Sequence, residues 1–277
     1  MEQETLVRLS SFVGVLLILL LCERFWPRRA WRQARMDRFV INITLIALSA
    51  LAQRFTLGAA AVGVAFYAQA QGWGLFNLVN LPFWAGLLLG VLLLDLAIYL
   101  QHVMFHKVSL LWRLHQVHHA DLDLDATTGL RFHPIEILLS LLIKTVVVAL
   151  LGISPWVVII FEVLLNASSM FNHSNLRLPD GVERRLRWCI VTPDMHRIHH
   201  SVHRTETDSN YGFFLSIWDR MLGTYTRTPR DGHEAMVLGL DYCQRPERLK
   251  LGRLLMMPFL VHPYSHNTNP DTHDSGG

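Results

Sequence analysis

One apolar stretch sets the architecture of this chain: residues 82–105 read PFWAGLLLGVLLLDLAIYLQHVMF. It contains a single charged side chain, Asp95, and no Asp, Glu, Lys or Arg occurs anywhere from Phe55 to Leu94. A helix needs about 20 mainly apolar residues to cross the hydrocarbon core of a bilayer. The stretch therefore predicts a membrane-spanning helix, and this helix carries His102 close to one of its ends.

The composition of the whole chain agrees with a membrane protein. Of its 277 residues, 51% are hydrophobic and only 17% are charged, whereas a soluble globular domain carries about a quarter charged residues. The same figures exclude collagen-like, disordered and small disulfide-rich proteins. The net charge of +3 comes without a basic stripe, which argues against a nucleic-acid partner. The three cysteines are widely spaced, so neither a disulfide framework nor a zinc ribbon is expected.

Further apolar segments predict additional spans before residue 82. The first is expected over Leu6–Cys22, as an uncleaved membrane helix, because no small-residue cleavage site follows it. A second begins near Phe39 and ends near Arg54, and the aromatic stretch 64–81 is expected to lie at the membrane interface. Between the first two spans, the arginine-rich loop 23–38 predicts the cytoplasmic side.

The second half of the chain alternates between polar and apolar segments. A polar loop (107–134) precedes two short apolar runs (135–171), which are expected to cross as a hairpin or to dip in and return. Residues 172–260 are charged and are expected to form a soluble cap, and 261–277 a disordered tail. We thus predict an all-α integral membrane bundle: about three spans within 1–106, an apolar hairpin, and a cytoplasmic helical cap.

Histidines are concentrated in the parts of the chain that this topology places on one side of the membrane. Eleven of the fifteen lie between His102 and His203, many of them in the motifs HVMFH (102–106), HQVHH (115–119) and HRIHH (196–200). Spacings of three and four residues place imidazoles on one face of a helix. With two further histidines, the candidate metal ligands are His102, His106, His115, His118, His119, His133, His173, His196, His199 and His200.

This density predicts a metal centre with more than one ion. A single HxxH on a helix is common and means little, but imidazole is the commonest protein ligand for metals. Ten candidates are too many for one ion, and they suit two ions of high coordination number, which favours iron over tetrahedral zinc.

Three further residues attract attention, and two of them, Asp95 and His203, allow two interpretations. Asp95 lies on one helical stripe with His102, so it either accepts the ring N–H of a ligand histidine or makes a structural contact with a tyrosine or an arginine. Glu136 is interpreted as a carboxylate that stabilises a helix start. His203 is expected to be exposed, the alternative being an eleventh ligand.

The segments HVMFH, HQVHH, FHPIE, FNHSN and HRIHH, followed by SNYGFF and WDRMLGTY, resemble the fatty acid hydroxylase / sterol desaturase superfamily. The resemblance runs from about Asp95 to Tyr225. Members of that superfamily are integral membrane, non-haem di-iron oxygenases acting on lipids. By position, the resemblance implies as iron ligands the candidates named above, with His133 less uniformly present across the family.

The resemblance also implies a reaction: O2-dependent hydroxylation or desaturation of a membrane lipid such as a sterol, hopanoid or fatty acyl chain. The chain has no iron–sulfur cysteine cluster and no flavin-binding glycine pattern, so a separate reductase, ferredoxin or cytochrome is expected to supply electrons. The centre is expected on the cytoplasmic side, in the plasma or inner membrane if the protein is bacterial.

The alternative hypothesis is a histidine-rich membrane metal transporter or sensor without oxygenase activity, which would place ligands along a path near the bilayer midplane. The absence of HExxH, GxSxG and P-loop motifs argues against metalloprotease, α/β-hydrolase and nucleotide-dependent functions.

Overall fold

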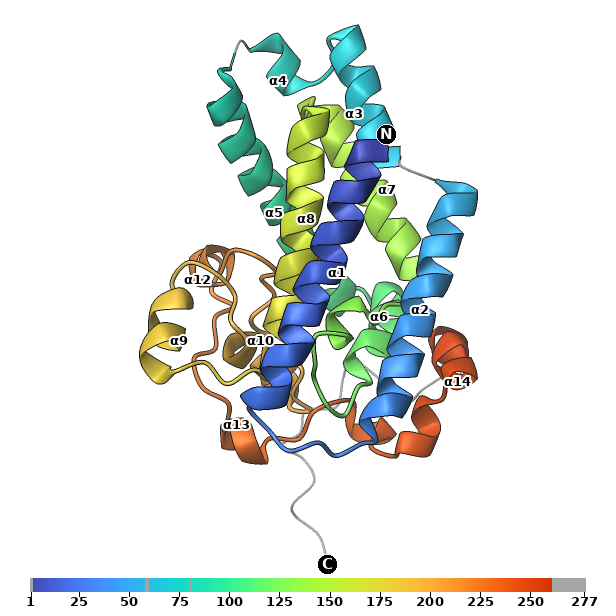
Figure 1. Cartoon of the computed structure of the whole chain (residues 1–277), viewed down its shortest axis with the longest axis vertical. Coiled ribbons are helices and arrows are strands. Elements are labelled where there is room, and N and C mark those ends of the chain that lie inside the picture. Colours follow the sequence, from blue (N-terminus) through green and yellow to red (C-terminus); the bar gives the residue numbers. More distant parts are fainter. Residues whose placement is uncertain (1, 58–59, 80, 261–277) are drawn as a thin grey trace, which may run out of the picture.

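The computed structural model describes residues 2–57, 60–79 and 81–260, and within these residues it contains helices and no β-strand. The all-α prediction is confirmed, whereas the expected tail 261–277 lies outside the described residues. Figure 1 shows a bundle of long helices with shorter ones gathered at one end. The long helices are α1 (Glu2–Phe25), α2 (Arg35–Thr56), α3 (Ala60–Gln71), α5 (Phe83–Lys107), α7 (Pro134–Leu151) and α8 (Pro155–His173).

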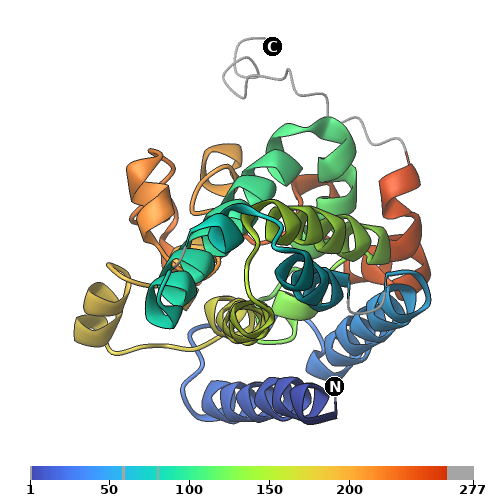
Figure 2. The ribbon, with the colours of Figure 1, turned by 90° about the horizontal axis from the view of Figure 1, so that it is seen from above.

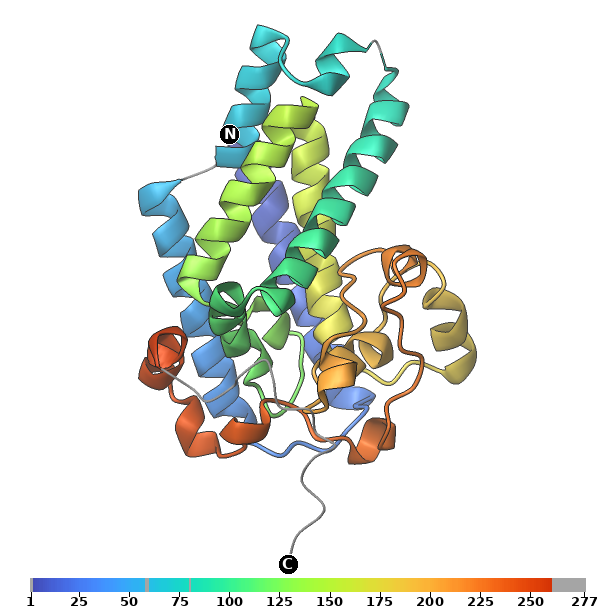
Figure 3. The same ribbon diagram turned by 180° about the vertical axis from the view of Figure 1, so that it is seen from behind.

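The short elements form the cap and the connections. Helix α4 (Leu75–Leu78) joins α3 to α5. The others are α6 (Ser109–His119), η1 (Thr128–Leu130), α9 (Asp180–Leu186), α10 (Pro193–His199), α11 (Arg204–Thr207), α12 (Ile217–Met221), α13 (Gly232–Ala235), η2 (Asp241–Cys243), η3 (Pro246–Leu249), α14 (Leu251–Met256) and η4 (Met257–Phe259). In the view from behind, α5 runs from the far end of the bundle down into this cap (Figure 3).

Among the described residues, five segments are long and apolar enough to cross a membrane: Thr5–Phe25, Arg35–Leu78, Phe83–Lys107, Pro134–Leu151 and Pro155–His173. Large apolar side chains on their outer surfaces are exposed, among them Leu17, Leu88 and Trp156. An exposed apolar surface of this extent fits contact with lipid and supports an integral membrane protein.

Helix α3 belongs to the bundle although its sequence suggests an interfacial stretch. Its buried residues are Ala61, Val62, Ala65 and Ala68, and the helix packs against α7 and α8. Small side chains let helices approach closely, which is how membrane helices pack without a hydrophobic driving force. In the view from above, α8 lies between α1 and α5, and it contacts both (Figure 2).

The hairpin of α7 and α8 follows from its turn residues. Each helix begins with a proline, which suits a first helical position, and Gly152 ends α7 in the left-handed conformation at φ 67°. A Cβ at Gly152 would lie 2.5 Å from the carbonyl oxygen of Trp73. The glycine therefore serves both the turn and the close approach of the α3–α4 connection.

The arginine-rich segment 23–38 lies at the cap end of the bundle, where several of its side chains bind the protein itself (Figure 1). Arg38 is buried, and it binds both carboxylate oxygens of Asp121 at 2.9 Å and Asp125 at 2.7 Å. Arg28 binds Asp194 at 3.2 Å. These arginines thus connect the first two helices to the cap instead of facing lipid headgroups.

Candidate metal centre

Nine of the ten candidate histidines lie together, in two groups where α5, α6, α8 and α10 meet. In each group, ligand atoms from all members lie within 4.8 Å of one another, and every member is buried. The five-histidine cluster consists of His102, His106, His115, His119 and His199. The four-histidine cluster consists of His118, His173, His196 and His200.

Each HxxHH motif is divided between the two clusters in the same way. On α6, His115 and His119 belong to the five-histidine cluster and His118 to the other. At α10, the first and last histidines of the motif join the four-histidine cluster, and His199 joins the five-histidine cluster. The ring centroids of His118 and His119 are only 5.4 Å apart, so the clusters are neighbours.

Backbone carbonyls fix the orientation of several rings through their Nδ1 atoms. The carbonyl oxygen is an acceptor only, so each Nδ1 carries the proton and the Nε2 of the neutral ring keeps a lone pair. The pairs are His102 with Tyr211 at 2.6 Å, His118 with Arg131 at 3.2 Å, His173 with Ser169 at 2.7 Å and His199 with Ser209 at 2.7 Å.

These lone pairs point at one another. The Nε2 of His173 lies 2.9 Å from that of His118 and 3.1 Å from that of His196. In the other cluster, the Nε2 atoms of His102 and His115 are 3.1 Å apart. Two facing lone pairs repel unless a cation lies between them, so the donor set fits bound metal ions.

The charge state of the rings agrees with this fit. Burial, reinforced by neighbouring imidazoles, holds the pKa of each of five rings well below its usual value: His118, His119, His196, His199 and His200. Burial lowers the pKa of His115 to about 3. The neutral imidazole is the form that binds metal, so these side chains are ready ligands at neutral pH.

Glu136 orients one candidate ligand, although the sequence suggests only a role at a helix start. It does lie in the first turn of α7, and there its Oε1 is 2.6 Å from the Nδ1 of His115. A carboxylate behind a ligand histidine fixes the ring and strengthens its donor atom. The signal in the sequence is the FHPIE segment, where Pro134 starts a helix close to the histidine loop.

Asp95, in contrast, binds the cap. Its Oδ2 accepts hydrogen bonds from the indole Nε1 of Trp218 at 2.8 Å and from the backbone N–H of Leu215 at 3.1 Å. Tyr99, one turn further along α5, bonds the hydroxyl of Thr224 at 2.8 Å. These bonds join α5 to the cap, and none of the described bonds of Asp95 reaches a cluster histidine.

The two other histidines that the sequence brought into question, His133 and His203, lie outside both clusters. His133 precedes α7, where its Nδ1 accepts from the backbone N–H of Ile135 and its Nε2 lies 3.2 Å from the carbonyl oxygen of Leu255. The Nε2 of His203 lies 2.7 Å from Asp231 near the surface.

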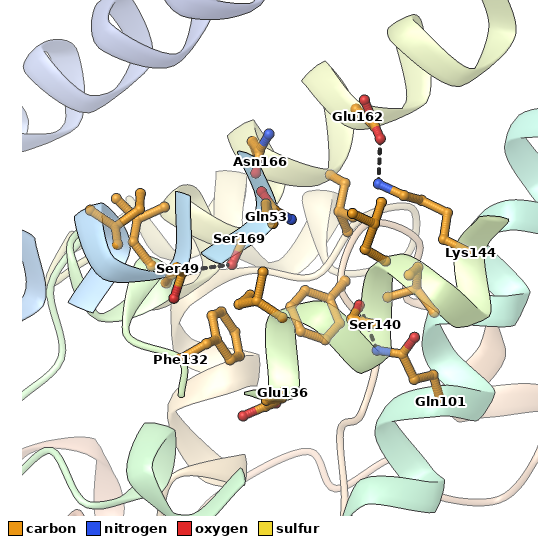
Figure 4. A pocket seen from close by; sticks show the side chains of 18 of the residues that line it. Ser49, Gln53, Gln101, Phe132, Glu136, Ser140, Lys144, Glu162, Asn166 and Ser169 are labelled. Carbon is orange, nitrogen blue, oxygen red and sulfur yellow. Dashed lines mark hydrogen bonds and ion pairs between the residues drawn. The ribbon is translucent and has the colours of Figure 1, made fainter. Parts of the chain in front are cut away.

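A cavity of about 370 Å³ extends from the five-histidine cluster into the bundle, between α1, α2, α5, α7 and α8. His102, His115 and Phe132 line it at the cluster end, and its walls are mostly apolar. Figure 4 shows Phe132 and Glu136 at one end, with Lys144 and Glu162 facing each other at the opposite end. These last two are charged residues inside apolar helices, and no sequence motif pointed to them.

Comparison with known proteins identifies the domain that contains the clusters. The model of the family described as "Fatty acid hydroxylase" matches residues 87–224. An ornithine lipid hydroxylase of Rhizobium tropici is 32% identical over 142 residues, which cover 51% of this chain and 42% of that protein. The human alkylglycerol monooxygenase is 26% identical over 241 residues, covering 83% of this chain and 49% of that protein.

A cholesterol 25-hydroxylase of Rattus norvegicus is 28% identical over 157 residues, covering 56% of this chain and 51% of that protein. The chain thus spans about half the length of these relatives or somewhat less. No solved structure matches the chain significantly. The resemblance predicted from the histidine motifs is confirmed, and the chain belongs to the fatty acid hydroxylase family.

Proposed function

We propose that this chain is an O2-dependent lipid oxygenase that holds two iron ions, one in each histidine cluster, and hydroxylates or desaturates a C–H bond of a membrane lipid. The observation that carries the proposal is the pair of buried clusters at the end of an apolar cavity. The names of the relatives, all lipid hydroxylases or monooxygenases, support the reaction class.

The spacing of the donor atoms favours iron over zinc. Two ligands at right angles with metal–nitrogen bonds of about 2.1 Å have their nitrogens about 3.0 Å apart, whereas tetrahedral ligands are separated by about 3.4 Å. Three of the Nε2 separations are 2.9, 3.1 and 3.1 Å, and all ligand atoms of each cluster lie within 4.8 Å of one another. Groups of five and four imidazoles also suit ions of high coordination number.

The protein contributes ring positions and a dry environment to this chemistry. Bound iron would supply the activation of O2 and the oxidation of the C–H bond. The carbonyls of Tyr211 and Ser169 hold two ligand rings in the orientation that binding needs. Phe132 stacks on the His118 ring at 4.4 Å and lines the cavity, so it shields the clusters from water.

We further propose that the clusters lie on the cytoplasmic side and receive electrons from a separate reductase, ferredoxin or cytochrome. Basic segments favour the cytoplasmic side, and the arginine-rich segment lies at the cap end of the bundle (Figure 1).

The proposal is tested with the full chain expressed in a lipid-rich host, with iron counted in the purified protein and host lipids compared by mass spectrometry. About two irons per chain are expected, with a lipid that gains one oxygen or loses two hydrogens. His118→Ala should abolish the lipid change, while the matched control His203→Ala, outside both clusters, should retain it. Uptake of zinc or copper without oxygen consumption would instead favour a transporter or sensor.

A further inference from the structure

Four large apolar side chains are exposed on one side of the cap, and we call them the cap flank: Trp188, Ile217, Met221 and Leu222. Their exposed fractions are 65%, 44%, 67% and 53%. Ile217 and Met221 are four residues apart on α12, so they share a face of that helix. Trp188 adjoins α12 because the guanidinium of Arg220 lies 4.4 Å from the centre of its ring. Exposed apolar side chains gathered in this way mark a contact with a partner or a membrane.

Helix α12 is attached to the middle of the membrane-spanning helix α5. The indole Nε1 of Trp218 and the backbone N–H of Leu215 both donate hydrogen bonds to Asp95. Asp95 is the thirteenth of the 25 residues of α5. In Figure 1, α12 accordingly lies nearer to the long helices than α13, which is at the far end of the cap.

The position of Asp95 along α5 sets the depth of α12. Phe83 and Trp84 begin the helix and are exposed, as aromatic side chains at a membrane interface are. Asp95 follows Phe83 by twelve residues, or about 18 Å along the helix, whereas the hydrocarbon core of a bilayer is about 30 Å thick. The core therefore extends past Asp95 toward the cap, and Leu100, beyond Asp95, is likewise exposed. At this depth the surroundings of α12 are lipid.

The residues that border the cap flank suit the headgroup region of a membrane. Tryptophan is favoured at the interface, and Arg220, which lies over the Trp188 ring, has a long apolar stem and a charged end. Arg184 and Arg185 are exposed in the last turn of α9, close to Trp188 in sequence, whereas the acidic side chains of α9 are in its first turn. Apolar side chains bordered by tryptophan and arginine are typical of a segment that lies in the plane of a membrane.

Helix α12 also connects the cap flank to the five-histidine cluster. The carboxylate of Asp219 accepts hydrogen bonds from the backbone N–H groups of Tyr211 at 2.7 Å and Gly212 at 2.9 Å. The carbonyl of Tyr211 in turn holds the ring of His102. The helix thus exposes apolar side chains on one side and, on another, supports the segment that orients a candidate ligand.

We propose that the cap flank lies in the cap-side leaflet of the membrane. Ile217, Met221 and Leu222 contact acyl chains, and Trp188 and Arg220 lie among the headgroups. The partner of this surface is the lipid bilayer, because the cap flank continues the lipid-facing surface of α5 at the same depth. The contact needs neither metal nor substrate, so it stands apart from the function proposed above.

The test uses the full chain in phosphatidylcholine nanodiscs, with a nitroxide spin label on a single introduced cysteine. Power saturation compares collisions of the label with O2, which concentrates in the bilayer, and with a water-soluble nickel complex. The test positions are Ile217→Cys and Met221→Cys. Leu88→Cys, on the outer surface of α5, is the reference for lipid, and Glu234→Cys, on α13, is the reference for water. All are made with Cys189→Ser, which removes the exposed native cysteine and gives the background when labelled alone.

Labels at Ile217 and Met221 should behave like the label at Leu88. Their collisions with the nickel complex should be about tenfold fewer than at Glu234, because a surface about 5–10 Å inside the headgroup boundary excludes a polar reagent. Their collisions with O2 should exceed those at Glu234. Melting curves identify a label that disturbs the fold, and the other position then decides the question.

Two results would overturn the inference. If both labels meet the nickel complex as often as the label at Glu234, the cap flank faces water and is open to a soluble protein. If both labels are shielded from O2 as well as from the nickel complex, protein covers the surface, as in contact with a second copy of the chain.

Discussion

Glu136→Gln should weaken metal binding in the five-histidine cluster and spare the four-histidine cluster. Glu136 bonds a candidate ligand ring directly, through the 2.6 Å contact with the Nδ1 of His115, whereas Asp208 lies 3.5 Å from the Nδ1 of His106. With metal bound, the Nε2 of His115 would coordinate the ion, so Nδ1 would carry the proton and donate a hydrogen bond to the carboxylate of Glu136. Glutamine retains the shape and an acceptor oxygen but removes the negative charge.

The structure sets the size of the effect. A charge-assisted hydrogen bond contributes about 1.5–3 kcal/mol and a neutral one about 1 kcal/mol, so the substitution costs about 0.5–2 kcal/mol. At about 1.4 kcal/mol for each factor of ten, metal affinity in that cluster should fall roughly 2- to 30-fold. Partners that orient ligand histidines typically change metal affinity by about 10- to 100-fold, which is compatible with this range.

The assay is an anaerobic titration of metal-free protein with iron(II) against a chromophoric chelator, which resolves a stronger and a weaker site. Asp95→Asn is the matched control, because it also neutralises a buried carboxylate but one that bonds Trp218 and Leu215. The control should lower the melting temperature and leave both affinities unchanged. Equal loss of metal in the two variants, or no loss in Glu136→Gln, would refute the reasoning.

Further predictions concern stability and the remaining histidines. Each bound metal ion should stabilise the fold by about 2.7 kcal/mol when the free metal concentration is about 100 times the dissociation constant of its site. Removal of metal with a chelator should therefore lower the melting temperature, and added iron should restore it. Arg38→Met leaves two buried carboxylates without their guanidinium, so the free energy of unfolding measured by chemical denaturation should fall by about 3–5 kcal/mol. The control Arg24→Met, at an exposed arginine, should lower it by less than about 1 kcal/mol. His133→Ala should retain the full iron content measured by mass spectrometry, at the expense of about 1 kcal/mol from the lost helix cap. Burial lowers the pKa of His233 to about 4. Below about pH 6.5 the unfolded chain therefore binds a proton that the native chain does not, and the free energy of unfolding falls as the pH approaches 4. In melting curves recorded over this pH range, His233→Gln should remove about 1–2 kcal/mol of that fall, a value reduced to allow for the partial exposure of the ring.

The length of the apolar runs predicted most of the long helices, with α3 expected at the interface instead, and the spacing of the histidines predicted the helices that carry the candidate ligands. An apolar run of sufficient length predicted the helix at 82–105, and α5 occupies Phe83–Lys107. The apolar hairpin expected within 135–171 is α7 and α8, which are separated by Gly152 and a loop that ends at Pro155. The length of an apolar run and the residues of a turn depend only on neighbours along the chain, so both can be predicted from the sequence.

The division of each HxxHH motif between two clusters also follows from helix geometry. At about 100° per residue, position i+4 lies about 40° to one side of i and position i+3 about 60° to the other. Three histidines at this spacing therefore cover an arc of about 100°, which is wide enough to face two sites. On α6, His115 and His119 face one cluster and His118 the other, as this arc requires.

Contacts between distant segments were harder to predict. Lys144 and Glu162 are each a charged residue inside an apolar helix, and they lie eight residues before and ten residues after Gly152. In an antiparallel hairpin such positions are level with each other, so the sequence contains the signal for their pairing. The contribution of Arg8 depends on how α1 packs on α8, which no spacing within the hairpin indicates.

The roles of Asp95 and Glu136 show where periodicity ceases to be informative. Asp95 shares a helical stripe with His102, yet a stripe specifies only direction, and the partner on that side is the cap segment 215–218. Glu136 lies far from His115 in sequence and shares no helix with it, but the loop between α6 and α7 returns the chain so that they touch. Orienting acceptors occur in both places: the carbonyl of Ser169, one turn away on the same helix, holds His173, whereas a carboxylate of another helix holds His115. Spacing along one helix therefore neither requires nor excludes such a contact, and the packing of α7 against α6 is what brings Glu136 to His115.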